Sequence, residues 1–375
     1  MVTLGFIGLI VSGLNEEEKN FDAKIKKARG SLYSFLGPIY SSKSLLSPRL
    51  QLHIYRTYIC PIARSGLAAM SLREKHLTPL MIFQRKILRA FLHLSEKSPN
   101  PALYFLTGEL PINAMVHKDV FSLFHNVWSN PNTKVFEIVK YLLHNAPLNS
   151  NTWSSHVKSL AFEYEIEDPT SMITKKPSNK AVFKEYINSK ITSSCEKQLR
   201  DASRNNSKMS YFNVSVKGLN GRCHSALIGC KETKDIPKLR AHIKLLCGDL
   251  FTYEQRSKYI GGSPHCRLCS HDNLKPERPV ENVCHLDAEC EAFKDVRENV
   301  VMEMKSVCSK SDYNLELVFN SKSLLTQFIL DCTSLNLPNR ISPEDPISQD
   351  IFKLSRDICF HICSQRSKML ETAVS

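Results

Sequence analysis

The sequence lacks the short motifs that mark common classes of enzyme. It has no glycine-rich phosphate loop, no His-Glu-x-x-His pair and no nucleophile elbow. Its clustered carboxylates, at 16–18 and 163–168, lie in polar stretches that we expect to be exposed. Two-metal phosphoryl transfer needs carboxylates on a buried pair of strands, and the sequence offers no such pair. We therefore expect a chain that has no catalytic site of its own.

Signals of a secreted or membrane protein are also missing. The apolar run at residues 4–11 is too short to span a bilayer, and no basic segment precedes it. The 13 cysteines are odd in number and mostly scattered. That pattern differs from the disulfide framework of a small secreted protein. These features predict reduced thiols, no membrane partner and a nuclear or cytoplasmic location.

The sequence has fewer acidic than basic residues. The 375 residues include 37 acidic and 50 basic side chains, a net charge of +13. The hydrophobic share of 42% is that of a folded protein, and the length is enough for two or three domains. A basic surplus suits a polyanion, because lysine and arginine bind phosphates regardless of base sequence. The composition favours the backbone of RNA or DNA as a partner.

Apolar residues recur at helical spacing through most of the chain, which predicts a mainly α fold. Gly37-Pro38 should end the first helix, and Ser47-Pro48 should cap and begin the second. Residues 4–11 read as a buried strand for which no partner sheet is evident. Residues 146–180, rich in Asn, Ser, Thr and Pro, read as a linker. The predicted helices cover residues 21–36, 48–60, 72–94, 112–128, 133–144, 180–204, 235–247, 291–306, 322–332 and 347–371.

Four residues have the spacing of a metal site. Cys266 and Cys269 form a Cys-x2-Cys pair, and His285 and Cys290 follow as His-x4-Cys after fifteen intervening residues. Three thiolates and one imidazole are the ligand set of a closed, structural zinc site, which leaves no position for a substrate. The rival ligands, which the spacing leaves open, are Cys284, His265 and His271. The sequence therefore predicts structural Zn²⁺ in a small knuckle.

The order of the segments resembles the C-terminal part of the reverse transcriptase of a non-LTR retrotransposon (LINE-like, jockey-type). Residues 4–8 and 21–25 are similar to the strand and helix that follow the polymerase hairpin of that family. Residues 50–62 and 80–89 are similar to its thumb helices. Residues 238–242, the Cys/His cluster and Phe293-x3-Arg297 are similar to its terminal CCHC knuckle.

The resemblance implies a nucleic-acid-binding fragment of a polymerase. The palm carboxylates of the family are absent, so this chain by itself is not expected to copy RNA. Its partners would be RNA or DNA and the missing palm and fingers. The alternatives are a truncated gene model of an active RNA-directed DNA polymerase and a zinc-stabilised protein-interaction adaptor. The residues expected to contact phosphate are Lys24, Lys27, Arg85, Arg89, Lys238, Arg240 and Lys244.

The expected organisation has five parts. They are a residual palm-edge strand (1–20), a thumb-like helical bundle (21–145), a linker with basic helices (146–234), a zinc-knuckle region (235–305) and a helical C-terminal tail (306–375).

Overall fold

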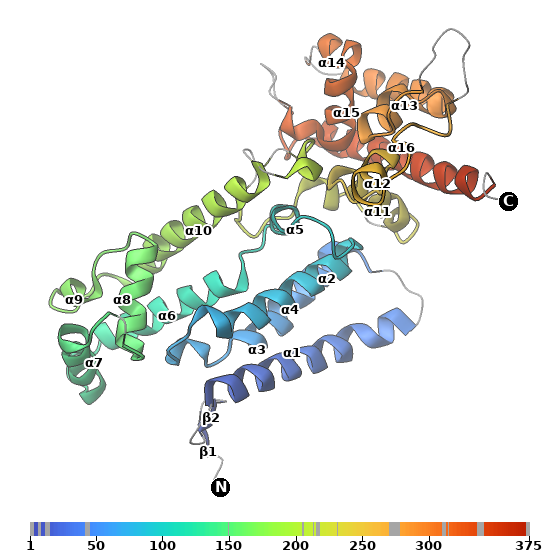
Figure 1. Cartoon of the computed structure of the whole chain (residues 1–375). Helices are drawn as coiled ribbons and strands as arrows, with labels where there is room; N and C mark the ends of the chain where they lie inside the picture. The colour runs from blue at the N-terminus through green and yellow to red at the C-terminus, as the bar shows by residue number, and fades with distance from the viewer. Residues whose placement is uncertain are drawn as a thin grey trace.

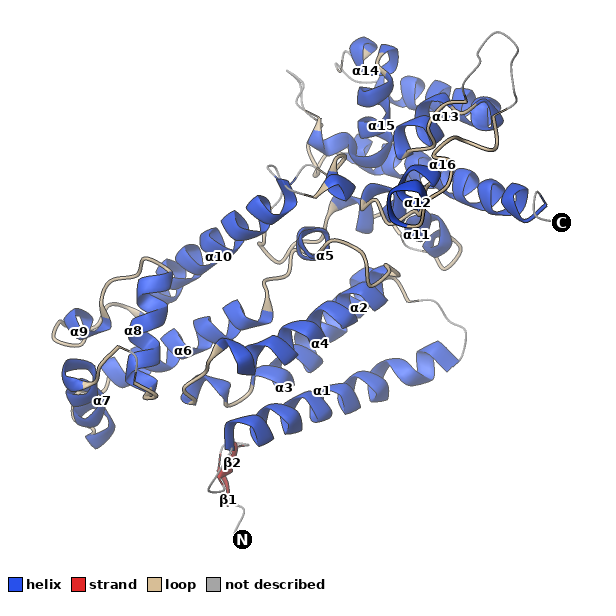
Figure 2. Ribbon diagram, viewed as in Figure 1, coloured by secondary structure: helices blue, strands red, loops and turns tan. Residues whose placement is uncertain are grey.

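The fold is mainly α, as the apolar spacing predicts (Figure 2). The computed structural model describes residues 4–6, 9–11, 16–41, 46–148, 150–204, 206–212, 214, 218–230, 232–269, 278–309, 313, 315–335 and 341–372. Within these ranges no helix combines the length and apolar character that crossing a membrane requires.

The first half of the chain forms an elongated bundle (Figure 1). Its elements are β1 (Leu4–Phe6), β2 (Leu9–Val11), α1 (Glu16–Ser41), α2 (Pro48–Ile54), α3 (Cys60–Arg64), α4 (Glu74–Leu92), α5 (Asn100–Thr107), α6 (Ile112–Trp128), α7 (Lys134–Asn145), α8 (Trp153–Glu163), α9 (Pro169–Met172) and α10 (Lys180–Arg204). The helix α5 is buried over Pro101–Thr107 and lies in the core of this bundle.

The second half packs around one long helix (Figure 1). Its helices are α11 (Asp235–Leu246), α12 (Tyr253–Tyr259), α13 (Lys294–Cys308), α14 (Glu316–Asn320), α15 (Lys322–Asp331) and α16 (Pro346–Thr372). The segment after residue 306 is helical, as expected. It is not a tail, because its last helix is part of the core. In α16, Ile351, Phe352 and Ile358 are fully buried, so this helix belongs to the core against α11 and α13.

The apolar run at 4–11 forms two short strands, not one. β1 and β2 pair antiparallel, with Leu4 opposite Val11 and Phe6 opposite Leu9. The partner that the sequence did not reveal is therefore the other half of the same run. We expected the side chains of residues 4–11 to be buried, but these side chains are outside the described part of the structure. The backbone of residues 7–8 is outside it as well.

The second predicted helix is interrupted by a π turn. Ser47 caps α2 as expected, since its hydroxyl accepts a hydrogen bond from the amide of Leu50. A π turn at Tyr55–Ile59 then joins α2 to α3. Pro61 has no N–H to continue the ordinary ladder, which accounts for the wider turn. The first helix also differs, because α1 passes Gly37-Pro38 and ends at Ser41, which leaves the proline in its last turn.

The stretch predicted as a linker, 146–180, is largely folded into the bundle. The helix α8 buries Val157 and Leu160 against α6, and the indole N–H of Trp153 donates to the carbonyl of Ala68 at 2.7 Å. The Tyr164 hydroxyl lies 2.8 Å from His117 Nδ1 in a buried hydrogen bond. Apolar residues at helical spacing outweigh the polar composition here.

The two halves meet where Gly108 follows α5. The amide of Gly221 donates to the carbonyl of Gly108 at 2.9 Å, and that of His224 donates to the carbonyl of Leu106 at 2.8 Å. Gly108 has φ +68°, and a Cβ at this position would lie 2.2 Å from the carbonyl oxygen of Arg222. The junction therefore requires glycine for both backbone conformation and space.

Gly108→Ala should lower the free energy of unfolding well beyond the cost of a positive φ. Gly221→Ala is a matched control, because Gly221 has φ +78° but no neighbouring atom within 4 Å of the place that a methyl group would occupy. The control should lose about 1–2 kcal/mol, and Gly108→Ala clearly more. Urea unfolding of both variants measures the difference. Equal losses would show that the close approach at Gly108 does not exist.

Candidate functional site

Three thiols and one imidazole converge in the second half of the chain. The ligand atoms of Cys266, Cys269, His285 and Cys290 all lie within 4.8 Å of one another, and all four residues are buried. The Sγ atoms of Cys269 and Cys290 are 3.7 Å apart, and those of Cys266 and Cys290 are 4.0 Å apart. The Nε2 atom of His285 lies 3.3 Å from the Cys269 Sγ. This group could hold a metal ion.

A short backbone pairing positions the first two cysteines. The amide of Cys266 donates to the carbonyl of Pro279 at 2.8 Å, and the amide of Glu281 donates to the carbonyl of Pro264 at 2.9 Å. These bonds bring residues 264–266 beside 279–281. Residues 270–277, between them, lie outside the described residues. The pairing therefore fixes the backbone position of Cys266, the first residue of the Cys-x2-Cys turn.

A π turn over His285–Glu289 positions the second pair of ligands. The amide of Cys290 donates to the carbonyl of His285 at 2.7 Å and closes this turn. Arg297, on α13, donates to the Cys290 carbonyl at 3.0 Å, while Phe293 is buried beneath the turn. The Phe293-x3-Arg297 pattern seen in the sequence thus supports the backbone of a candidate ligand.

Side chains around the group orient the histidine. His285 Nδ1 lies 3.5 Å from a carboxylate oxygen of Glu289, which in turn pairs with the Lys322 ammonium at 2.9 Å. A carboxylate behind a ligating histidine fixes the ring and leaves Nε2 for the metal. Lys322 begins α15, so the group is supported by a helix distant in sequence.

The rival ligands are directed elsewhere where they are described. His265 Nδ1 lies 2.5 Å from the carbonyl oxygen of Arg278, as expected for a ring bonded to backbone. The Cys284 thiol accepts from the Thr326 hydroxyl at 3.5 Å. His271 lies outside the described residues. Between His265 and His285, the geometry favours His285 as the nitrogen ligand.

Hydrogen bonds from its neighbours favour the thiolate form of Cys266. The pKa of Cys266 is lowered to about 3, first by a hydrogen bond with Cys290 and then by His285 and the amides of Leu268 and Cys269. Burial acts in the opposite direction and raises the pKa of Cys269. The turn after Cys266 therefore directs backbone N–H groups at its sulfur. None of the 13 cysteines forms a disulfide.

The residues expected to contact phosphate fall into two groups. Lys24 is only 6% exposed, and its ammonium donates to the Ser65 hydroxyl at 2.9 Å. Arg89 donates to the Ser98 carbonyl at 3.1 Å, and Lys238 pairs with a carboxylate of α16 at 2.5 Å. These three are engaged inside the chain, and Lys24 is the least accessible. Lys27 and Lys244 are exposed, and Arg85 and Arg240 are half-buried.

Four of the expected residues lie on two helices, α4 and α11, that approach each other near His93. Arg85 and Arg89 lie on α4, which ends at Leu92 and is followed by His93. The pKa of His93 is lowered to about 4, mainly by burial and then by the charges of Arg240 and Lys244 on α11. The pKa of Arg89 is lowered by burial and by Arg85. We call Arg85, Arg89, Arg240 and Lys244 the junction cluster.

A bond between loops holds the two helices of this cluster together. Asp249, just after α11, accepts hydrogen bonds from the amide of Ser95 at 2.8 Å and from its hydroxyl at 2.5 Å. Ser95 follows α4. In the sequence these basic residues belong to separate helices far apart along the chain, and only tertiary folding shows that they share one surface region.

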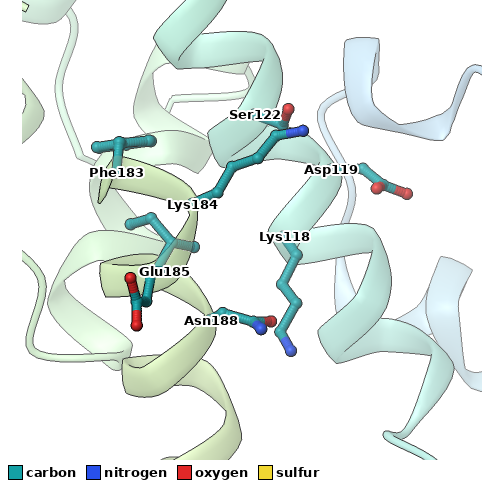
Figure 3. A pocket seen from close by; sticks show the side chains of 8 residues that line it. Lys118, Asp119, Ser122, Phe183, Lys184, Glu185 and Asn188 are labelled. Atoms are coloured by element: carbon teal, nitrogen blue, oxygen red, sulfur yellow. The ribbon is translucent and has the colours of Figure 1, made fainter. Parts of the chain in front are cut away.

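A cavity of about 340 Å³ between α6 and α10 was not foreseen (Figure 3). Lys118 and Lys184 extend into the space from facing helices, whereas Asp119 points away toward Arg64, its ion-pair partner at 3.5 Å. Burial lowers the pKa of Lys118 to about 8. Glu185 also lines the cavity, so its charge is mixed and does not single out an anionic ligand.

Comparison of the chain with protein-family models, with curated proteins and with solved structures found no match.

Proposed function

We propose that this protein binds nucleic acid through its phosphate backbone and that a structural zinc ion folds the segment around the Cys/His group. The observation that carries the proposal is the junction cluster, two cations on α4 and two on α11, helices whose ends are joined by the bond between Ser95 and Asp249, in a chain of net charge +13. In keeping with the sequence resemblance, the chain would correspond to the thumb and knuckle of a non-LTR reverse transcriptase without the palm.

The dimensions of the Cys/His group support zinc. Ligands at about 2.3 Å for sulfur and 2.0 Å for nitrogen in a tetrahedron lie ~3.5–3.8 Å from one another. The sulfur pairs at 3.7 and 4.0 Å and the sulfur–nitrogen pair at 3.3 Å are close to these values. Three soft thiolates and one imidazole also suit zinc better than the oxygen-seeking ions. Because all four ligands come from the protein, such an ion would be structural.

The like charges near the junction cluster favour an anionic partner such as phosphate. Burial and then Arg85 lower the pKa of Arg89, while the nearby carboxylates of Glu96 and Asp249 act in the opposite direction. Burial and then the charges of Arg240 and Lys244 lower the pKa of His93. Like charges held near one another by folding lose this repulsion when an anion lies between them. A phosphate backbone supplies such anions at regular intervals and with no requirement for base sequence.

Lys244→Ala should weaken binding equally for RNA oligonucleotides of different sequence. Losing one phosphate contact should make the slope of log affinity against log salt shallower by about 1. Fluorescence anisotropy at several salt concentrations measures both effects. Lys140→Ala is a matched control, since Lys140 is an exposed lysine on α7, outside the cluster. An unchanged slope for Lys244→Ala would remove α11 from the binding surface.

A protein-interaction adaptor is the second candidate, and one surface favours it. Val135, Ile138 and Tyr141 form an exposed apolar stripe on α7, and Phe162 on the adjacent α8 is 84% exposed. Such stripes mark protein contact sites. A partner that survives nuclease treatment and is lost with Ile138→Glu would support this role. A partner lost with nuclease alone would favour nucleic acid.

A further inference from the structure

A groove beside the junction cluster combines exposed aromatic rings with cations. A cavity of about 520 Å³ is lined by Lys97, Lys208, Phe251 and Tyr259, together with polar side chains such as Gln255. This volume is within the range of sites that hold small organic groups. A second cavity, of about 200 Å³, shares Lys208, Gln255 and Tyr259 with it. The two form one continuous groove along α12.

Tyr259 is the most exposed aromatic residue in the groove. Its side chain is 69% exposed at the end of α12, and Phe251, before the same helix, is 42% exposed. Exposed aromatic side chains that share a groove are typical of a surface that binds a ligand. Arg256 is exposed one turn before Tyr259, and side chains three residues apart share a helix face.

The groove and the junction cluster are linked through the loop that follows α4. Lys97 lies two residues after Ser95, whose amide and hydroxyl bond Asp249 at the end of α11. The Lys208 ammonium donates to the carbonyl of Lys97 at 3.1 Å, which holds the two sides of the groove together. A strand whose phosphates contact the cluster could therefore place its next bases over Phe251 and Tyr259.

We infer that this groove binds unpaired bases, so that the preferred ligand of the protein is single-stranded nucleic acid, with Tyr259 as the main stacking surface and Lys97 and Arg256 beside the backbone. The inference rests on the proposed function and specifies its ligand. Aromatic rings stack on bases of any identity, whereas a duplex keeps its bases covered. Glu254 lines the smaller cavity but pairs with Lys258 at 2.8 Å. Lys97 and Arg256 remain exposed beside the rings, and this charge favours a nucleic acid over an apolar peptide.

The test compares three labelled probes of equal length: single-stranded oligo-dA, an abasic strand of the same charge, and a blunt duplex. Wild-type protein should bind oligo-dA most tightly. Tyr259→Leu should weaken oligo-dA binding roughly 5- to 150-fold per base unstacked and leave the abasic strand unchanged. Tyr259→Phe, which keeps the ring, should retain affinity. Tyr259 is exposed, so these variants should fold.

Tyr141→Leu is the control, since Tyr141 is a similarly exposed tyrosine on α7. If Tyr259→Leu and Tyr141→Leu both bind oligo-dA like wild type, the stacking inference is overturned while phosphate binding stands. If wild type binds the abasic strand as tightly as oligo-dA, the inference fails in the same way. If wild type binds none of the probes at any salt concentration, the proposed function fails as well. A nuclease-resistant protein partner lost with Tyr259→Leu would assign the groove to protein and overturn the inference.

Discussion

Cys266→Ser should abolish metal binding and unfold the segment around the knuckle. The purified wild-type chain should carry one zinc per molecule, and the variant none. The free energy of zinc binding, on the order of 10 kcal/mol or more, is also folding free energy for such sites. A chelator should therefore lower the Tm of the wild-type protein and have no further effect on the variant. Mass spectrometry under native conditions and thermal unfolding measure these outcomes.

Two matched variants separate the ligands from their neighbours. Cys284→Ser and His265→Asn alter the rival residues, whose side chains contact Thr326 and the Arg278 carbonyl rather than the group. Both variants should keep one zinc. Loss of zinc in His265→Asn, with zinc retained in His285→Asn, would show that the ligand assignment is wrong.

Arg366→Leu should lower the free energy of unfolding by about 3–5 kcal/mol, because it strands a buried carboxylate. The side chain of Glu281 is fully buried, and its Oε1 accepts from Arg366 Nη2 at 2.7 Å and from the Tyr253 amide at 3.0 Å. Arg366 also donates to the Phe251 carbonyl at 3.2 Å. This pair links α16 to the segment that carries the metal ligands and to the start of α12.

A double variant tests whether the buried charge causes the loss. Glu281→Leu combined with Arg366→Leu removes both charges and should recover part of the stability lost by Arg366→Leu alone. Lys353→Leu, an exposed position on the same helix, should change stability little. If Arg366→Leu unfolds in urea at the same midpoint as Lys353→Leu, the pair does not hold α16 in place.

The elements that the sequence predicted best have local signals. The helices α6 and α10 begin and end where apolar periodicity and flanking prolines predict, at 112–128 and 180–204. The metal group was also predictable, because its ligands lie within 25 residues and thiolate turns have a narrow spacing. The helix α8 was not predicted, although Trp153, Val157 and Leu160 lie at helical spacing, because the polar composition of the stretch masks its periodicity.

The sequence alone did not predict contacts between residues that are far apart along the chain. Lys24 and Lys27 look equivalent on one helical turn, yet folding buries Lys24 against Ser65, forty-one residues away. The partner of Glu281 is Arg366, eighty-five residues later, and no spacing rule relates them. The groove at Tyr259 likewise depends on Lys97 and Lys208. Burial, ion pairing and groove formation follow from packing that periodicity alone does not encode.

The measurement that tests the proposed function most directly is the affinity of the purified protein for a labelled single-stranded RNA at about 50 and 200 mM salt. Three to five phosphate contacts by the junction cluster and its neighbours should weaken binding roughly 20- to 130-fold over that interval. Lys244→Ala should show a smaller loss. An affinity that is the same at both salt concentrations, or no binding at either, would contradict the proposal that this basic surface binds nucleic acid.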